Sequence, residues 1–244
     1  MLIINADDFG RNGAATDSTI ACHGQQSITS ASAMVFMADS HRAAELAAWC
    51  GLETGLHLNF TQPLDGPDIA PPIKEHHVTV SRYLCRGKWA QIIYNPFLQN
   101  SLDYIFKAQE EEYRRLYSKE PAQIDGHSHM HLCMNMIIGH IIPPGKKIRR
   151  SFTFRRGEKS FLNRFYRRQI DKWATRHHIS TDSFFSIEPV SDRSRVEKIV
   201  HLALSSDVEL MVHPAEARQF EYLMSSEFLY LIQDVPKGSY RMLA

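Results

Sequence analysis

The chain has 244 residues, of which 43% are hydrophobic and 23% are charged, and its formal net charge at pH 7 is +1. This composition is typical of a globular protein and argues against a disordered chain or one that spans a membrane. A charge so close to zero gives no sign of a nucleic-acid partner, and the length fits one α/β domain over 1–244.

Short apolar runs alternate with amphipathic stretches along the chain. In chain order, the pattern predicts a strand at 2–6, a helix at 13–23, a strand at 28–36, a helix at 40–49, a strand at 56–60, a helix at 102–117, a strand at 123–131, helices at 161–177 and 193–204, and a strand at 208–212. Strands that alternate with helices are typical of parallel sheets, so we expect an α/β barrel-like fold. A run rich in Pro, Gly and Asp at 61–72 predicts a loop over the mouth of the barrel.

The first residues and the cysteines bear on the cellular compartment. The apolar start at 1–6 runs directly into Asp7 and is too short for a secretory signal or a membrane helix, so we expect a cytoplasmic protein. The four cysteines are scattered and form no CxxC pair; they are Cys22, Cys50, Cys85 and Cys133. We expect them to be reduced and structural.

Two adjacent carboxylates stand where the first predicted strand should end. They are Asp7 and Asp8 of the run N-A-D-D-F-G at 5–10. Parallel α/β folds place their active sites at the carboxyl ends of strands, and a chain that twists there can bring both side chains into one cavity. The alternative is a structural pair at the start of a helix, where acidic side chains are favoured as caps.

Two further apolar runs contain or end in a single histidine. His57 lies within T-G-L-H-L-N at 54–59, and His213 follows L-M-V at 210–212. A single histidine in such a run is more often a hydrogen-bonded core residue than a functional one. Neither residue would indicate a site by itself.

The run D-G-H-S-H-M-H at 125–131 alternates ionisable residues with others. As a strand, it would direct Asp125, His127, His129 and His131 to one face. Burying four such groups is costly unless a metal, proton transfer or water satisfies them, whereas an edge strand could leave them in solvent. The buried alternative predicts a functional site.

Together, these residue types are typical of a catalytic metal centre. One carboxylate and two imidazoles bind a divalent metal such as zinc or magnesium and leave positions open for water and substrate. The metal lowers the pKa of bound water and polarises an acyl oxygen, while hydrolysis of an amide also needs a base and an acid. The second aspartate and the C-terminal histidine can supply them.

In order and spacing, the four runs resemble the YdjC-like carbohydrate deacetylases, a family that includes the chitooligosaccharide deacetylases. The resemblance covers nearly the whole chain and implies a single-domain (β/α) barrel-like deacetylase fold. It also implies one divalent metal ion, Mg or Zn, held by Asp8, His57 and His127. The run R-N-G at 11–13 departs from the usual form of the family, which leaves the substrate contacts open.

The resemblance further implies roles and partners. Asp7 is expected to act as general base and His213 as general acid, and the substrate is expected to be an N-acetylated amino sugar such as an oligosaccharide. Asp125, His129 and His131 are expected to line the pocket or to orient a ligand-binding side chain. Family members are often dimers, which leaves a homodimer open.

A basic segment at 146–176 carries many more cationic than anionic side chains. Its cations are Lys146, Lys147, Arg149, Arg150, Arg155, Arg156, Lys159, Arg164, Arg167, Arg168, Lys172 and Arg176. Apolar side chains recur at helical spacing within it, which predicts a basic amphipathic helix preceded by a basic loop. Either the helix packs on the outside of the barrel with its charges solvated, or the basic groups of the segment, Arg149 among them, bind a phosphate-bearing or membrane-associated substrate such as a lipid- or nucleotide-linked amino sugar.

Two other functions use the same residue types. A metal-dependent phosphoesterase or another amidohydrolase also employs His-rich strands and Asp pairs, but two-metal sites usually contain more carboxylates. A sugar-binding or metal-storage module without turnover would need neither Asp7 nor His213. The sequence therefore favours a carbohydrate N-deacetylase.

Overall fold

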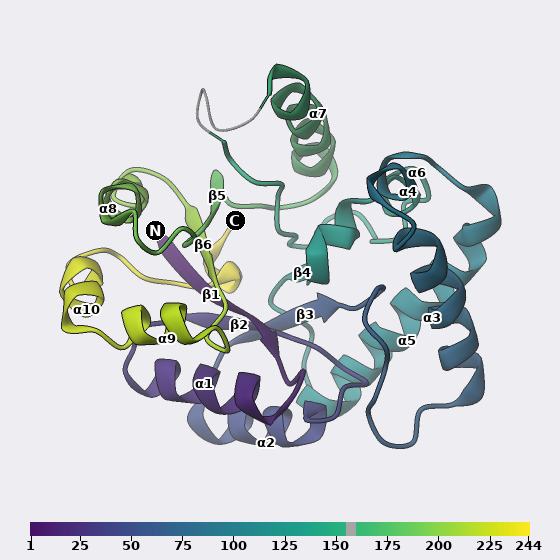
Figure 1. Ribbon diagram of the computed structural model, residues 1–244, viewed down its shortest axis with the longest axis horizontal. Helices are drawn as coiled ribbons and strands as arrows, with labels where there is room; N and C mark the ends of the chain where they lie inside the picture. Colours follow the sequence, from purple (N-terminus) through teal and green to yellow (C-terminus); the bar gives the residue numbers. More distant parts are fainter. Residues whose placement is uncertain (155–159) are drawn as a thin grey trace.

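A curled, fully parallel sheet lies at the centre of the structure, a computed structural model that describes residues 1–154 and 160–244 (Figure 1). Within these residues the strands are β1 (Leu2–Phe9), β2 (Ser30–Ala33), β3 (Thr54–Leu58), β4 (Ile124–Gly126), β5 (Ser183–Ser186) and β6 (Val208–Val212). Their spatial order is β4-β3-β2-β1-β6-β5, and each neighbouring pair is parallel. Because β4 and β5 form the two edges, the predicted barrel-like α/β fold is confirmed in an open form.

Helices surround the curled sheet and return the chain from one parallel strand to the next (Figure 1). The described α-helices are α1 (Gly13–Gly24), α2 (Ser40–Cys50), α3 (Pro71–Leu84), α4 (Lys88–Ile92), α5 (Gln99–Tyr117), α6 (Met134–Ile138), α7 (Phe161–His177), α8 (Arg193–Leu202), α9 (Ala217–Leu223) and α10 (Ser226–Ile232). Short 3-10 helices are η1 (Pro96–Leu98), η2 (His127–Leu132) and η3 (Tyr240–Met242). Helix α1 packs against β1, α5 against β3, and α8 against β6.

Alternation along β1 separates an apolar face from a polar one. Leu2, Ile4 and Ala6 join the main hydrophobic core, while the buried Asn5 lies on the other face. Asn5 Nδ2 donates to Ser32 Oγ of β2 at 2.7 Å, so small polar side chains continue this face onto the next strand. Beyond Ile3, which packs in a second hydrophobic cluster, this face of the sheet is therefore polar toward the carboxyl ends of the strands although it is buried.

The middle of the chain differs from the sequence-based expectation. The strand predicted at 123–131 ends at Gly126, because Ser128 and His129 have left-handed backbone angles, with φ of 54° and 59°, and the chain turns into η2. The expectation that four ionisable side chains share one strand face is therefore wrong.

Several elements were not among the predicted ones, and β5 and α3 are two of them. Strand β5 has only four residues, too few for its alternation to be recognised. Helix α3 starts within the predicted loop at 61–72, because Pro71 and Pro72 occupy its first turn, where proline is favoured. The loop is therefore confined to 61–70.

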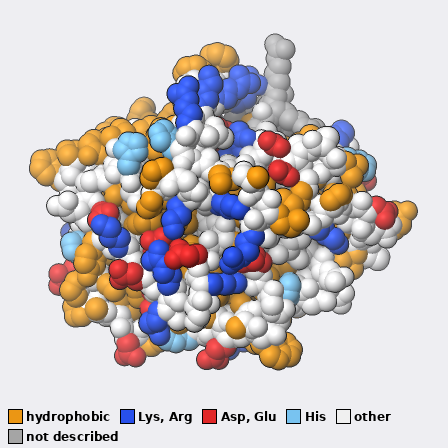
Figure 2. All heavy atoms as spheres, turned by 180° about the vertical axis from the view of Figure 1, so that it is seen from behind, with side chains coloured by type: hydrophobic (Ala, Val, Ile, Leu, Met, Phe, Trp, Pro, Cys, Tyr) orange, Lys and Arg blue, Asp and Glu red, His pale blue; other side chains and the backbone are white. Residues whose placement is uncertain are grey.

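The predicted basic helix is α7, and only part of its apolar stripe packs on the rest of the chain. Ile170 and Ala174 are buried, whereas Phe161, Leu162 and Phe165 are 70%, 76% and 53% exposed. Figure 2 shows hydrophobic and basic side chains together at the top of the molecule, where α7 lies. The alternative in which the apolar stripe of an outer helix packs fully on the rest of the protein is therefore wrong for the first half of α7. Three further cations of the basic segment lie outside the described residues: Arg155, Arg156 and Lys159.

Two remaining expectations concern membrane-spanning helices and the cysteines. None of their helices is both long and apolar enough to cross a bilayer. The four cysteines carry free thiols, as expected, and Cys22 and Cys133 are buried.

Candidate metal centre and its buried charge network

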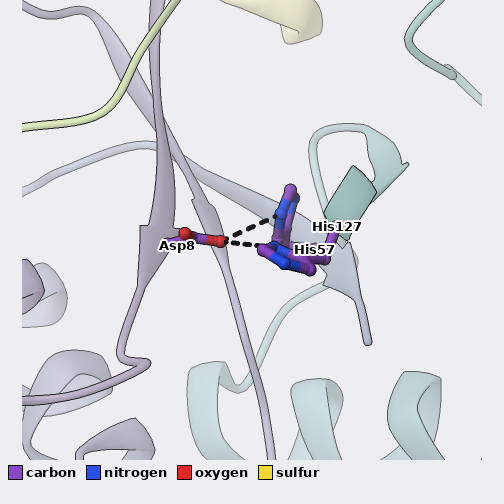
Figure 3. A group of neighbouring side chains, drawn as sticks. All are labelled: Asp8, His57 and His127. Carbon is purple, nitrogen blue, oxygen red and sulfur yellow. Dashed lines mark hydrogen bonds and ion pairs between the residues drawn. The ribbon is translucent and has the colours of Figure 1, made fainter. Parts of the chain in front are cut away.

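Three candidate metal ligands converge at the carboxyl ends of the strands although they are far apart in the sequence (Figure 3). Asp8 lies at the end of β1, His57 near the end of β3, and His127 directly after β4. One carboxylate oxygen of Asp8 lies 2.9 Å from His127 Nδ1 and 3.3 Å from His57 Nε2. The structure thus brings together the three residues that the resemblance assigns to a metal.

The spacing and chemistry of these atoms fit a divalent metal. Two ligand atoms that lie ~2.1 Å from a metal and at roughly a right angle are about 3 Å apart, close to the separations found around Asp8. Each side chain offers a ligand atom within 4.8 Å of the other two. His57 Nε2 is buried, and its 3.3 Å contact with Asp8 is an ion-pair contact rather than a hydrogen bond, so among the described residues this nitrogen has a hydrogen-bonding deficit that a metal would satisfy.

The backbone at Asp8 explains how two adjacent aspartates serve different partners. Asp8 has φ of 65°, in the left-handed region, and the register of β1 against β2 shifts between Ala6 and Phe9. This irregularity turns Asp8 toward the two histidines while Asp7 continues the inner polar face of the sheet. Both carboxylates therefore reach one end of the sheet.

Asn12, rather than either aspartate, caps helix α1. Its side-chain oxygen accepts a hydrogen bond from Ala15 N at 3.0 Å. In the same turn, Gly10 has φ of 84°, and Arg11 donates to the second Asp8 oxygen at 2.7 Å. The helix-capping interpretation of the aspartates is therefore wrong, and the unusual R-N-G run places a cation beside Asp8.

Asp125 holds the ring of His57 from the side opposite Asp8. The sheet register pairs His57 with Asp125, and Asp125 Oδ1 lies 2.7 Å from His57 Nδ1. Burial lowers the pKa of His57, but the surrounding carboxylates, Asp125 foremost, outweigh it and raise the pKa to about 10. A carboxylate on the far nitrogen fixes the orientation of the ring and makes it a better metal ligand.

Asp7 is held by a buried guanidinium. Arg149 donates to both Asp7 oxygens, at 2.6 and 2.7 Å. Burial raises the pKa of Asp7, but the charge of Arg149 outweighs it and holds the pKa well below its usual range. Asp7 is therefore an anion at neutral pH.

Arg149 is fully buried and has no exposed surface to offer a substrate. Besides Asp7, its guanidinium lies 2.9 Å from Asp125 and 2.7 Å from Glu209. The structure therefore places Arg149 behind Asp7, apart from the surface of the basic segment.

Two residues that the sequence analysis did not single out complete this network. Glu209 is buried in the middle of β6 and accepts from Arg149 Nε at 2.8 Å. Tyr240, in η3, donates its hydroxyl to the other Glu209 oxygen. Burial raises the pKa of Glu209 to about 7 against the pull of Arg149. In the sequence, Glu209 could have been recognised as the one charged residue within the apolar run V-E-L-M-V at 208–212.

The turn η2 gives His129 and His131 contacts of their own. His131 Nε2 lies 2.9 Å from the backbone carbonyl oxygen of Arg149. His129 packs edge-on against Phe152, with ring centroids 4.5 Å apart. Burial lowers the pKa of both histidines, that of His131 to about 4. Both rings lie in the wall beside the site.

His213 and the loop at 61–70 each act on one residue of the site. His213 follows β6, and its charge adds to that of Arg149 in lowering the pKa of Asp7. Gln62 of the loop places its side-chain amide 2.9 Å from His127 Nε2. The loop therefore contacts a candidate metal ligand.

Comparison with known proteins identifies the family. A family model described as "YdjC-like protein" matches residues 1–234. The chain belongs to the YdjC-like family. A chitooligosaccharide deacetylase of Yersinia pestis is 25% identical to it over 240 residues, which covers 94% of this chain and 87% of the relative. A chitooligosaccharide deacetylase of Serratia marcescens is 30% identical over 138 residues, or 54% of this chain and 51% of the relative.

A solved structure shares the fold of this YdjC-like chain. It is a protein of Enterococcus faecalis named as a candidate cellobiose-phosphate cleavage protein. The two structures superpose with a TM-score of 0.71 over 98% of this chain and 97% of the other, at 17% sequence identity. At this identity, the likeness shows the fold alone.

Proposed function

We propose that this YdjC-like chain is a divalent-metal-dependent hydrolase that removes the N-acetyl group from an N-acetylated amino sugar. The observation that carries the proposal is the convergence of Asp8, His57 and His127 beside the ionised Asp7. The deacetylase names of the relatives support the reaction, and their chitooligosaccharides suggest the substrate class.

Each side chain has a separate task in this proposal. Asp8, His57 and His127 hold the metal, which when bound lowers the pKa of a water and polarises the acyl oxygen. Asp7, kept ionised by its buried partner, accepts a proton from the attacking water as general base. His213, at the end of β6, donates a proton to the departing amine.

The same geometry argues against a two-metal phosphoesterase. Asp7, His57 and Asp125 also offer ligand atoms within 4.8 Å of one another. However, the guanidinium of Arg149 lies 2.6 Å from Asp7 and 2.9 Å from Asp125. It supplies the positive charge that a second metal would bring, so one metal and an amide substrate fit the site better.

An assay of the purified chain with added Zn²⁺, Mg²⁺, Mn²⁺ or Co²⁺ tests the proposal. N-acetylated chitooligosaccharides and, in parallel, an aryl phosphate are incubated with the protein, and free acetate and free phosphate are measured. We expect acetate release that a chelator abolishes and added metal restores. Phosphate release without acetate release would contradict the proposal and favour the phosphoesterase.

A further inference from the structure

Helix α7 presents exposed aromatic rings and cations on the same side. Phe161, Phe165, Arg168 and Lys172 follow one another at steps of four, three and four residues, which is the spacing that places side chains on one face of a helix. All four side chains are exposed. We call these four residues the outer face of α7.

The opposite face of α7 packs on the rest of the chain. Ile170 and Ala174 are buried, and Arg167 lies over the ring of Phe152 with its guanidinium carbon 5.7 Å from the ring centroid. In Figure 1, α7 stands at the edge of the molecule, away from the sheet. Because the inner face holds the helix in place, the outer face remains accessible to a partner.

The cations of the outer face have no counter-charge among the described residues. Asp171 is the one carboxylate of α7, and it lies 3.2 Å from Arg150 and accepts a hydrogen bond from Ser151 N. Across residues 1–154 and 160–244, no carboxylate is at ion-pair distance from Arg168 or Lys172. Figure 2 shows basic side chains clustered at the top of the molecule, where α7 lies. The outer face therefore carries a local positive charge, although the net charge of the chain is only +1.

The apolar side chains at the start of α7 extend the outer face. Leu162 is 76% exposed, and the rings of Phe161 and Phe165 stack on each other with centroids 6.4 Å apart. Trp89 and Ile93, on α4, are also exposed, and α4 and α7 both line one cavity of about 140 Å³. Since apolar surface in water is unfavourable, clusters of exposed apolar side chains typically mark an interaction site.

We propose that the outer face of α7 binds the surface of a bilayer that contains anionic phospholipids. A basic amphipathic helix lies in the plane of such a surface, with its aromatic and aliphatic side chains between the lipids and its cations against the negative charge. The long side chains of Arg168 and Lys172 can reach the headgroups while Phe161 and Phe165 enter the apolar layer. This inference goes beyond the proposed function and does not rest on it.

The charges of the outer face argue against two other partners. A two-fold contact between copies of this chain would bring two sets of Arg168 and Lys172 together, and like charges repel one another. A nucleic acid would neutralise these cations and stack on the aromatic rings, but it would leave the aliphatic Leu162 in water. An anionic lipid surface matches both the charged and the apolar groups.

Co-sedimentation with phosphatidylcholine vesicles, prepared with and without phosphatidylglycerol, tests the proposal at low ionic strength. We expect the chain to bind the anionic vesicles about 10-fold or more tightly than the neutral ones, because each cation near a negative surface adds attraction. Phe161→Ser with Phe165→Ser, and separately Arg168→Gln with Lys172→Gln, should each weaken binding to the anionic vesicles about 10-fold or more.

Two double variants on other surfaces are the matched controls. Trp49→Ser with Tyr230→Ser removes two exposed aromatic rings from α2 and α10, and Lys74→Gln with Lys198→Gln removes two exposed charges from α3 and α8. Each control should bind the anionic vesicles within about twofold of the wild type, because surface changes away from a binding face have small effects. Far-ultraviolet circular dichroism of every variant separates a loss of binding from a loss of fold.

A tryptophan at position 161 reports whether the outer face enters the bilayer. With anionic vesicles that contain brominated lipid chains, the emission added by Phe161→Trp should be quenched, whereas that added by Tyr230→Trp should not. Absence of vesicle binding by the wild type, equal losses in the control variants, or an unquenched Phe161→Trp overturns the proposal.

Two further outcomes identify a different partner. Dimerisation without vesicle binding, if Phe161→Ser with Phe165→Ser abolishes it, overturns the proposal in favour of a second copy of this chain. Binding of single-stranded RNA in place of vesicles overturns it in favour of a nucleic acid. Since every readout is a binding measurement, failure of acetate release would contradict the proposed function and leave this proposal to be decided by the vesicles.

Discussion

Asp8 shares one carboxylate oxygen between two histidines, so metal binding should depend on all three side chains together. We expect Asp8→Ala, His57→Ala and His127→Ala each to lose bound metal and acetate release in parallel, by about 100-fold or more, because loss of a supporting contact alone costs about 10 to 100-fold. Metal content after dialysis and acetate release are the measurements. His201→Ala, an exposed histidine on α8, is the control and should keep both. If any of these three ligand variants kept its full metal content, the assignment of that residue as a metal ligand would be wrong.

Asp7 and His213 should affect turnover without affecting metal content. Asp7→Asn and His213→Ala are expected to lower kcat by about 100 to 10,000-fold each, since this is the range of general base and general acid contributions. Metal analysis of the same samples should give a content near that of the wild type. Full activity in either variant, or loss of metal in both, is incompatible with these roles.

The residues that could be predicted from the sequence are those that stand out in a local run. Asp7 and Asp8 end an apolar strand, and His57 interrupts another, so each attracts attention without a structure. Glu209 and Tyr240 act only through Arg149, and nothing in their own neighbourhood reveals a partner distant in the sequence.

At the scale of elements, η2 shows where periodicity fails. The alternating run at 125–131 has the period of a strand, but the left-handed angles of Ser128 and His129 depend on packing that the pattern does not encode. Asp125 and His127 still reach the site, because the strand continues through the first of them and ends beside the second. The residues predicted for the site are therefore brought together although the predicted end of the strand is incorrect.

The close contact between Gly55 of β3 and Gln123, which precedes β4, gives a test of the packing at the buried polar face. A Cβ added at Gly55 would lie 2.3 Å from the side chain of Gln123, which donates to Asn5 at 3.1 Å. We expect Gly55→Ala to lower the free energy of unfolding by about 1 to 3 kcal/mol, because overpacking displaces a buried side chain. Urea denaturation measures this change.

Gly24→Ala is the matched control for that variant. Nothing lies within 4 Å of a Cβ added at Gly24, which ends helix α1. Its free energy of unfolding should stay the same or rise by up to about 1 kcal/mol, since alanine reduces the freedom of the unfolded chain. Equal stability of Gly55→Ala and the wild type would show that Gln123 moves aside without cost.

At the scale of the whole molecule, Arg149 connects parts of the chain that are remote in sequence. Its guanidinium contacts Asp7 on β1, Asp125 on β4 and Glu209 on β6, and Tyr240 extends the network to the end of the chain. The strand order brings these elements together, and the order follows from the fold rather than from any single motif. A resemblance that spans the whole chain predicts the fold, but it does not identify such a network.

Replacing Arg149 should destabilise the fold in a way that depends on pH. We expect Arg149→Leu to lower the free energy of unfolding by about 3 to 5 kcal/mol at neutral pH, because three buried carboxylates lose their counter-charge. In the variant, burial without the guanidinium raises the pKa of Asp7, so its carboxyl takes up a proton in the folded state as the pH falls and the penalty decreases.

The wild type should respond to acid in the opposite sense through Asp7. The pKa of Asp7 is lowered in the folded protein, so its stabilising contribution is present above its unfolded pKa of about 4 and is lost as the pH falls further. Proton uptake by the variant narrows the stability gap between wild type and variant as the pH is lowered from about 7 to about 4, and the loss of the Asp7 contribution narrows it further below about pH 4. Urea denaturation of the metal-free proteins across this range measures the gap, and Arg176→Leu should stay within about 0.5 kcal/mol of the wild type throughout. A gap that stays constant or widens in acid would mean that Arg149 does not stabilise the fold by neutralising these carboxylates.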